Sequence, residues 1–278
     1  MAKRARDEYA RKAGIKLSQP QERGVQLSVF PDTHSLSRAA AQRAHNILRT
    51  SIRDHGRARL VAATGKSQLE FLQGLTSADD LDWSRVELFH LDEYIGLPLS
   101  HPGSLRRYLL EHLVRKTGIT RYHFLDGEKE PREAINHVTR EIRKAPIDVA
   151  FLGVGENGHL AFNDPPADFD TQESFLVVDV SVQSREQQHR SGWFESLDEV
   201  PTRAITMTIS QILKSQEILC LAPEKRKAAA VARCFQGEIS PLAPASILRT
   251  HRNALVYLDV DSAALLSPEI VGQAQVVR

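Results

Sequence analysis

IDVAFLGVG (residues 147–155), which runs directly into ENGHLAFND (residues 156–164), is the stretch that decides the fold. Its first half is a continuous apolar run, which is typical of a strand buried on both faces of a parallel sheet. The glycines that follow allow the backbone to bend sharply and to approach a ligand closely. His159 is therefore predicted to lie just beyond the carboxyl end of a central strand, the edge at which open α/β sheets bind ligands.

Strand-like and helix-like segments alternate along the rest of the chain, with few long loops between them. This alternation predicts an α/β fold built on a doubly wound, mostly parallel Rossmann-like sheet, with helices flanking both faces. Apolar runs predict strands at 25–29, 58–63, 85–91, 122–125, 147–155, 176–180, 217–221 and 254–259. Amphipathic runs predict helices at 35–54, 67–75, 103–117, 131–144 and 225–234.

The composition is that of an ordinary globular enzyme with small-molecule partners. The 278 residues include 36 Lys and Arg against 35 Asp and Glu, so the chain lacks the basic footprint of a dedicated nucleic-acid binder. No apolar signal segment follows the basic N-terminus, and no apolar run reaches membrane-spanning length. We expect a cytoplasmic protein without membrane partners, with residues 1–24 as an extension and linker and residues 25–278 as a single domain.

Polar residues follow three of the predicted strands, at the point where each strand ends. Residues 64–67 follow one strand, Asp92 follows the next along the chain, and His159 lies in the turn after the third. Parallel strands present their carboxyl ends at the same edge of a sheet. We therefore expect all three turns to face one pocket.

The first of these turns offers an anion site. Four residues form it: Thr64, Gly65, Lys66 and Ser67. They open a helix, whose free backbone N–H groups and positive dipole end favour a phosphate. The turn is not a P-loop, because Leu60 replaces the upstream glycine, and a helix N-cap at Ser67 explains the pattern equally well. Arg190 and Lys227 are candidates for adding positive charge, with surface cations as the alternative.

Asp92 and His159 are the candidate proton-transfer groups. A carboxylate after a buried strand is costly unless it is paired or used chemically, and a turn cap is the alternative for Asp92. His159 follows Gly158 in a tight turn, where it has little reason to pack as core, and imidazole transfers protons near neutral pH. Asn157 and Asp164 lie near enough in sequence to orient the histidine.

No metal or cofactor is expected. The polar residues around Asp92 match no standard spacing of metal ligands: His90, Asp92, Glu93 and His101. Cys220 and Cys234 show no disulfide or zinc-binding spacing, which favours a reduced compartment and core packing. Glu156 is interpreted as a solvated turn residue.

Two longer motifs carry a family resemblance. LDEYIGLP from Leu91, with HPGS from His101, and GVGENGHLAFNDP from Gly153 are similar to signatures of the glucosamine-6-phosphate deaminase (isomerase) family, a relative of the 6-phosphogluconolactonases. The similarity in order and spacing extends from about residue 25 to the C-terminus. It implies a Rossmann-like enzyme of amino-sugar metabolism that converts glucosamine 6-phosphate and water to fructose 6-phosphate and ammonia, without metal or nicotinamide.

The resemblance also implies residue roles. Asp92 matches the carboxylate that moves a proton between C2 and C1, and His159 matches the histidine that assists opening of the sugar ring. Two groups match the phosphate site: the loop Thr64, Gly65, Lys66 and Ser67, and the cations Arg190 and Lys227. The chain departs from the family at Asn157 and Asp164, where an aspartate and a glutamate are usual, and at Lys66, which replaces a glycine.

Two alternatives to the deaminase stay open. A 6-phosphogluconolactonase-type hydrolase is disfavoured because such enzymes carry Asp-Glu-Arg where this chain has Tyr94 in third place, and Ser-Leu-Phe-Pro where it has residues 162–165. A non-catalytic sugar-phosphate sensor is suggested only by Asn157. The sugar epimer, allosteric control and a possible homo-oligomer are left open by the sequence.

Overall fold

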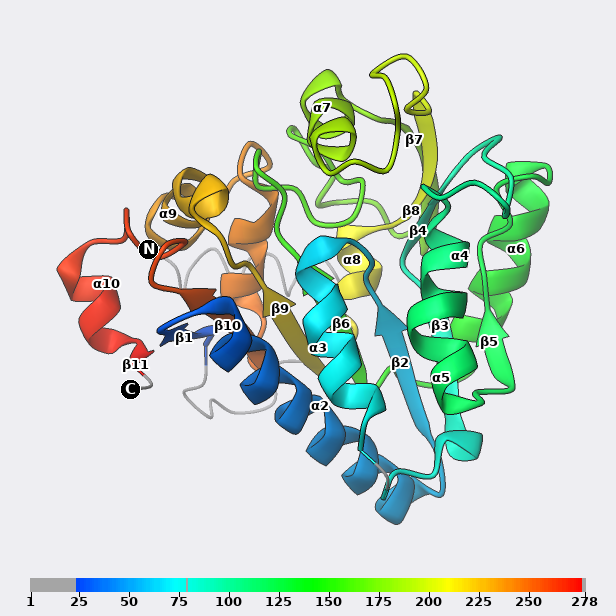
Figure 1. Cartoon of the computed structure of the whole chain (residues 1–278), viewed down its shortest axis with the longest axis horizontal. Helices are drawn as coiled ribbons and strands as arrows, with labels where there is room; N and C mark the ends of the chain where they lie inside the picture. Colours follow the sequence, from blue (N-terminus) through cyan, green and yellow to red (C-terminus); the bar gives the residue numbers. More distant parts are fainter. Residues whose placement is uncertain (1–23, 79, 277–278) are drawn as a thin grey trace.

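An eight-stranded parallel sheet forms the centre of the molecule (Figure 1). The computed structural model describes residues 24–78 and 80–276, so the predicted extension 1–24 lies outside the described residues except for Gly24. The strand order is β11-β1-β10-β9-β6-β2-β3-β5, and every pairing is parallel. The strands are β1 Gln26–Phe30, β2 Ala58–Ala62, β3 Val86–His90, β5 Arg121–His123, β6 Val149–Gly153, β9 Glu217–Leu221, β10 Ala254–Asp259 and β11 Gln275–Val276. The predicted doubly wound parallel sheet is confirmed.

Helices cover both faces of this sheet. The α-helices are α2 Thr33–His55, α3 Lys66–Thr76, α4 Leu105–Leu109, α5 Arg115–Thr117, α6 Pro131–Ile142, α7 Val182–Arg190, α8 Ile209–Ile212, α9 Ala228–Gln236 and α10 Pro268–Gln273. The 3₁₀ helices are η1 Trp83–Arg85, η3 Lys225–Lys227 and η4 Pro244–Thr250, and η2 Leu110–Val114 is a π-helix. Strand β2 shows why helices are needed on both faces, because its apolar side chains point alternately to the two sides of the sheet. Leu60 and Ala62 pack in the core under α2 and α3, and Val61 packs in the core on the opposite face.

A second, antiparallel sheet stands beside the first and was not predicted. It has the order β4-β8-β7, with β4 Asp92–Tyr94, β7 Phe175–Asp179 and β8 Arg203–Met207. Asp92, expected in a turn, instead begins β4 and pairs with Thr206. Strand β8, the partner of β4, lies more than a hundred residues further along the chain, so no local sequence pattern indicates this pairing. Tyr94, Phe162 and Phe194 belong to the small separate core of this part of the molecule.

The helix predicted at 103–117 begins later and is not regular. Ser104 caps it, accepting a hydrogen bond from the backbone N–H of Arg107, and the chain widens to a π-helix at η2 before α5 ends at Gly118. Such π segments are common at functional sites. Helix α7 was missed because its sequence, VQSREQQHR, has no apolar stripe.

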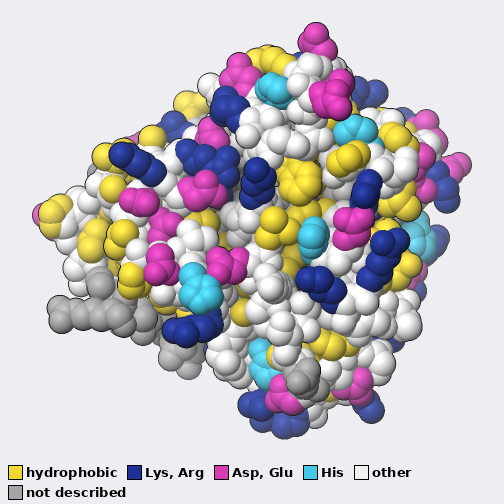
Figure 2. All heavy atoms as spheres, in the orientation of Figure 1, with side chains coloured by type: hydrophobic (Ala, Val, Ile, Leu, Met, Phe, Trp, Pro, Cys, Tyr) yellow, Lys and Arg dark blue, Asp and Glu magenta, His cyan; other side chains and the backbone are white. Residues whose placement is uncertain are grey.

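The surface shows no single field of charge on the face drawn in Figure 2, where Lys and Arg side chains are interspersed with Asp and Glu. This mixture agrees with the near-zero net charge. Among residues 24–78 and 80–276, none of the helices combines the length and apolar character needed to cross a bilayer.

Candidate active site

One pocket at the carboxyl ends of the central strands receives all three polar turns. Its lining includes the whole of the first turn (residues 64–67), Asp92 from β4 and His159 from the turn after β6. Other lining residues come from α4, from α7 and the residues after it, and from η3: Leu105, Tyr108, Gln187, Gln188, Ser191, Trp193, Arg226 and Lys227. The pocket therefore lies between the main sheet and the smaller antiparallel sheet.

The first turn is built as an anion site. Gly65 is the N-cap of α3, with φ 103° and ψ 169°, and no side chain caps the helix. The alternative explanation, a helix N-cap at Ser67, is not found, because Ser67 already lies inside the helix. Helix geometry leaves the N–H groups of Lys66 and Ser67 without intrahelical partners. The Tyr108 hydroxyl donates to the Gly65 carbonyl at 2.9 Å and so fixes the turn.

Asp164 gathers four hydrogen-bond donors around one carboxylate. Its Oδ1 accepts from Ser184 Oγ at 2.5 Å and from Asn157 Nδ2 at 2.9 Å, and it lies 3.0 Å from His159 Nδ1. Its Oδ2 accepts from the backbone N–H of Ser181 at 3.0 Å. Burial alone would raise the pKa of Asp164, but His159, Ser184 and Asn157 outweigh it and hold the pKa well below its usual range. The carboxylate is therefore ionised at neutral pH.

This carboxylate orients the histidine. Because His159 Nδ1 faces Asp164, Nδ1 carries the proton of the neutral ring and Nε2 keeps its lone pair. Asn157 also fixes the turn itself, since its Oδ1 accepts the backbone N–H of His159 at 3.0 Å. Gly155 allows the ring to lie against the turn, because a Cβ there would come within 2.3 Å of the His159 ring.

Asp92 is a buried carboxyl group without a partner. It is 7% exposed, and its side chain makes no hydrogen bond or ion pair with the described residues. Burial, and secondly the charge of Glu93, raise the pKa of Asp92 to about 8. Glu93 has a different surrounding, because its carboxylate accepts the backbone N–H groups of Leu105 and Arg106 at the start of α4. The two adjacent carboxylates therefore divide into a structural helix cap and a group that lines the pocket.

The polar residues near Asp92 do not assemble as metal ligands. His90 is fully buried with neither ring nitrogen bonded, and burial lowers its pKa to about 3, so it is neutral. His101 lies in the next loop, where its Nδ1 accepts the backbone N–H of Gly103.

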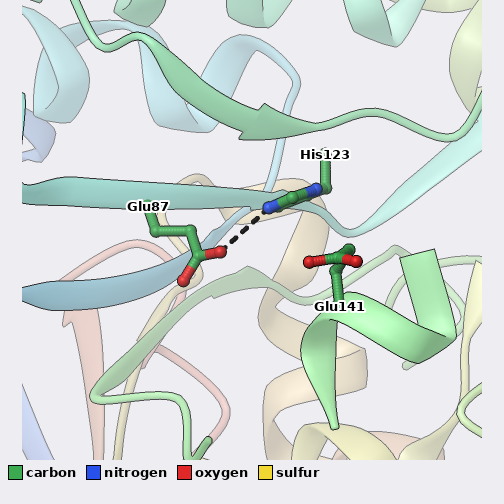
Figure 3. Close-up of side chains that lie close together, drawn as sticks. All are labelled: Glu87, His123 and Glu141. Atoms are coloured by element: carbon green, nitrogen blue, oxygen red, sulfur yellow. Dashed lines mark hydrogen bonds and ion pairs between the residues drawn. The ribbon is translucent and has the colours of Figure 1, made fainter. Parts of the chain in front are cut away.

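In the described part of the chain, one group has the arrangement of a metal site: Glu87, His123 and Glu141 (Figure 3). These residues lie outside the pocket lining. Burial would raise the pKa of Glu87, but hydrogen bonds from His123 at 2.9 Å and from Arg59 at 2.7 Å lower it to about 2. The buried Arg59 guanidinium already neutralises Glu87, so we interpret the group as a structural ion-pair network.

Three of the cations near the pocket, Lys227, Arg226 and Arg190, have different environments. Lys227 lines it and is 4% exposed, and burial, followed by the charge of Arg226, lowers the pKa of this lysine to about 8. Its ammonium makes no hydrogen bond or ion pair with the described residues. Arg226 also lines the pocket, whereas Arg190 lies on α7 outside the lining.

Glu156 lies in the predicted turn and is partly exposed, but its carboxylate is ion-paired. Its side chain is 23% exposed and accepts hydrogen bonds from Arg190 at 2.7 Å and from Arg226 at 3.2 Å. The sequence could not indicate these ion pairs, because both arginines reach Glu156 only through the tertiary fold. Ser184 and Arg226 were missed for the same reason, since α7 and η3 carry no local signal of a site.

Residues 31–257 match the family described as glucosamine-6-phosphate isomerases/6-phosphogluconolactonase. A glucosamine-6-phosphate deaminase of Exiguobacterium sibiricum is 35% identical over 208 residues, which cover 74% of this chain and 81% of the relative. One from Streptococcus uberis is 34% identical over 226 residues, which cover 81% and 94%.

Solved structures give the same family and fold. A monomeric glucosamine-6-phosphate deaminase superposes with a TM-score of 0.80 at 28% identity, covering 86% of this chain and 99% of that one. A 6-phosphogluconolactonase from Thermotoga maritima superposes with a TM-score of 0.70 at 20% identity, covering 84% and 99%. The likeness to the lactonase extends to the fold alone.

Proposed function

This chain belongs to the glucosamine-6-phosphate isomerase/6-phosphogluconolactonase family, and from that membership we propose that it converts glucosamine 6-phosphate and water into fructose 6-phosphate and ammonia. The observation that carries the proposal is the unpaired, buried Asp92 in one pocket with an oriented histidine and an open helix N-terminus. Proton transfer on a small anionic substrate needs these three parts.

The phosphate of the substrate binds at the start of α3. There the N–H groups of Lys66 and Ser67 donate to it, and the helix dipole favours its charge. Lys227, which has no protein partner, supplies the balancing ammonium. A fixed phosphate lets binding energy be used to position C1 and C2 of the opened sugar.

His159 opens the ring. Its Nε2 lone pair takes the proton from the O1 hydroxyl, and the resulting imidazolium is stabilised by the ionised Asp164 at Nδ1. The same Nε2 then returns a proton to O5 as the C1–O5 bond breaks. The product is the open-chain aldehyde with its amine at C2.

Asp92 carries out the isomerisation. Its carboxylate removes the proton from C2, which gives the C1–C2 enol with an amino group, and returns that proton to C1. The C2 imine that forms takes up water and releases ammonia, leaving the ketone of fructose 6-phosphate. The amine matters before this step as well, because a substrate ammonium beside Asp92 lowers the pKa of the carboxyl group and favours its ionised form.

The test is to measure ammonia and fructose 6-phosphate from glucosamine 6-phosphate with wild-type protein and with Asp92→Asn and His159→Gln variants. We expect equimolar products from the wild type and a loss of about 10²-fold or more in both variants. Wild-type protein that releases neither product refutes the proposal. Hydrolysis of 6-phosphogluconolactone in its place would support the lactonase, and fructose 6-phosphate binding without turnover would support the sensor.

A further inference from the structure

We infer that Glu156 is an internal counter-ion for the cations at the phosphate end of the pocket, and that a substrate phosphate has to compete with its carboxylate for them. The inference rests on the proposed function, because it assumes a phosphate near α3. It concerns a residue outside the catalytic and phosphate-binding groups assigned above.

The geometry of Glu156 divides its two oxygens between two guanidinium groups. Oε2 accepts from Arg190 at 2.7 Å, and Oε1 accepts from Arg226 at 3.2 Å. Its charge also acts on the buried ammonium of Lys227, where it favours the charged form. Glu156 therefore lies among three positive side chains: Arg226 and Lys227, which line one end of the pocket, and Arg190, which lies on α7 outside the lining.

No other carboxylate in residues 24–78 and 80–276 makes ion pairs with both arginines. Glu224 pairs with Arg226 at 2.7 Å, and Glu186 approaches Arg190 at 3.7 Å. Removal of Glu156 would therefore release Arg190 from its short ion pair and would weaken the hold on Arg226. Neither effect is expected from a change at Glu186.

A phosphate offers the same chemistry as this carboxylate. Guanidinium groups form charge-assisted hydrogen bonds with either anion, so the two compete for the same donors. A phosphate at the start of α3 also feels the negative charge of Glu156. Glu156 therefore lowers the affinity of the pocket for phosphate and favours release of the phosphorylated product.

The Glu156→Gln variant separates this role from a structural one. The backbone N–H of Glu156 donates to Gln187 Oε1 at 2.8 Å, and the substitution leaves this contact between the turn and α7 in place. Glutamine also keeps the size of the side chain. Only the charge is removed.

The experiment is a calorimetric titration of inorganic phosphate into wild-type, Glu156→Gln and Glu186→Gln proteins. We expect Glu156→Gln to lower the phosphate Kd by roughly two- to fivefold, the scale of exposed ion pairs. Glu186→Gln should change it by less than about twofold, because its contact with Arg190 is long and exposed. Raised ionic strength should reduce the difference between the proteins.

Unchanged or weaker phosphate binding by Glu156→Gln overturns the inference, and so does a wild-type protein that binds no phosphate. The titration needs no turnover, so the two proposals fail separately. Tighter phosphate binding without ammonia release would refute the deamination and leave the role of Glu156 standing. Ammonia release by the wild type, together with an unchanged phosphate Kd in Glu156→Gln, would support the deamination and refute the role of Glu156.

Discussion

Asp92 and Lys227 are opposite charges in one pocket, and burial shifts the pKa of each toward the other, to about 8. Asp92 has to be ionised to accept the C2 proton, and Lys227 has to be protonated to bind phosphate. We therefore expect kcat/KM to follow a narrow bell centred near pH 8. The acid limb of kcat should lie lower, because the substrate ammonium stabilises the ionised carboxylate.

The Lys227→Arg variant assigns the alkaline limb, because arginine stays charged throughout this range. Its kcat/KM should no longer fall above about pH 8, although its absolute value will be lower. An alkaline limb that is unchanged in Lys227→Arg would show that another group is responsible. Initial rates of ammonia release over the pH range provide the measurement.

Burial of Asp92 also has a cost in stability. Its pKa is raised from 3.8 to about 8, so the folded protein binds an extra proton between these limits. The free energy of unfolding therefore falls as pH rises through this window. Asp92→Asn lacks this loss, so its stability relative to wild type should increase between about pH 5 and about pH 8, by on the order of a few kcal/mol. Urea unfolding at both pH values tests this, and a constant difference would contradict it.

The structure gives a physical reason for an asparagine rather than an aspartate at position 157. Its Nδ2 donates to Asp164 at 2.9 Å, where an aspartate would oppose one carboxylate with another. We expect Asn157→Asp to lower stability by about 1–3 kcal/mol and kcat by about tenfold, because one carboxyl group must then take up a proton. Both losses should shrink as pH falls.

The control for that change is Asn253→Asp, which also removes an amide donor to an oxygen but at an exposed position. Its effect on unfolding should stay within about 0.5 kcal/mol. Urea unfolding and initial rates at neutral pH measure both variants. Full activity and stability in Asn157→Asp would show that the amide is interchangeable with a carboxylate here.

Single residues were predictable where their own strand placed them. Asp92 and His159 were found because each follows an apolar run that had to be a buried strand. Ser184 could not be found in this way, since it reaches Asp164 from a helix with no apolar stripe. Arg226 belongs to a basic run, and only the fold shows which member borders the pocket.

At the scale of elements, the parallel strands were predictable and the small sheet was not. A run such as ALVYLD at 254–259 is apolar on both faces and can only be a central strand. Strand β4 has three residues, and its pairing with β8 depends on chain brought back from residue 203 onward. The side of the pocket formed by the main sheet could therefore be predicted from the sequence, whereas the side formed by the small antiparallel sheet could not.

The role of the turn before α3 can be tested by substituting its glycine, Gly65. Gly65→Ala puts a side chain at φ 103°, and Gly118→Ala does so at φ 70° at the end of α5. A Cβ at either position meets nothing within 4 Å, so both variants should lose about 1–2 kcal/mol through backbone strain alone. Gly65→Ala alone should also raise KM, by roughly tenfold, because it distorts the N–H groups that bind phosphate. An equal KM for both variants would remove this turn from the phosphate site.

At the scale of the whole molecule, the pocket joins the two sheets, and a ligand should stabilise them together. Fructose 6-phosphate at about 100 times its Kd should raise the free energy of unfolding by about 2.7 kcal/mol. Lys227→Met should lose most of this increase at the same ligand concentration, because the buried ammonium of Lys227 lines the pocket and has no hydrogen bond or ion pair with the described residues.

Trp193 gives a signal from the pocket side of the molecule. It lines the pocket and packs against the small core and against the core under α2 and α3, in which Trp83 is buried. In a Trp83→Phe variant, fluorescence reports the pocket side, and far-ultraviolet circular dichroism reports all the helices. We expect both signals to show one unfolding transition that the ligand shifts equally. The two sheets are linked because β4 follows the main-sheet strand β3 directly in the chain and pairs with β8 of the small sheet. If the ligand shifts only the unfolding transition seen by Trp193 fluorescence, the pocket side unfolds separately from the rest of the molecule, and the ligand stabilises that side alone.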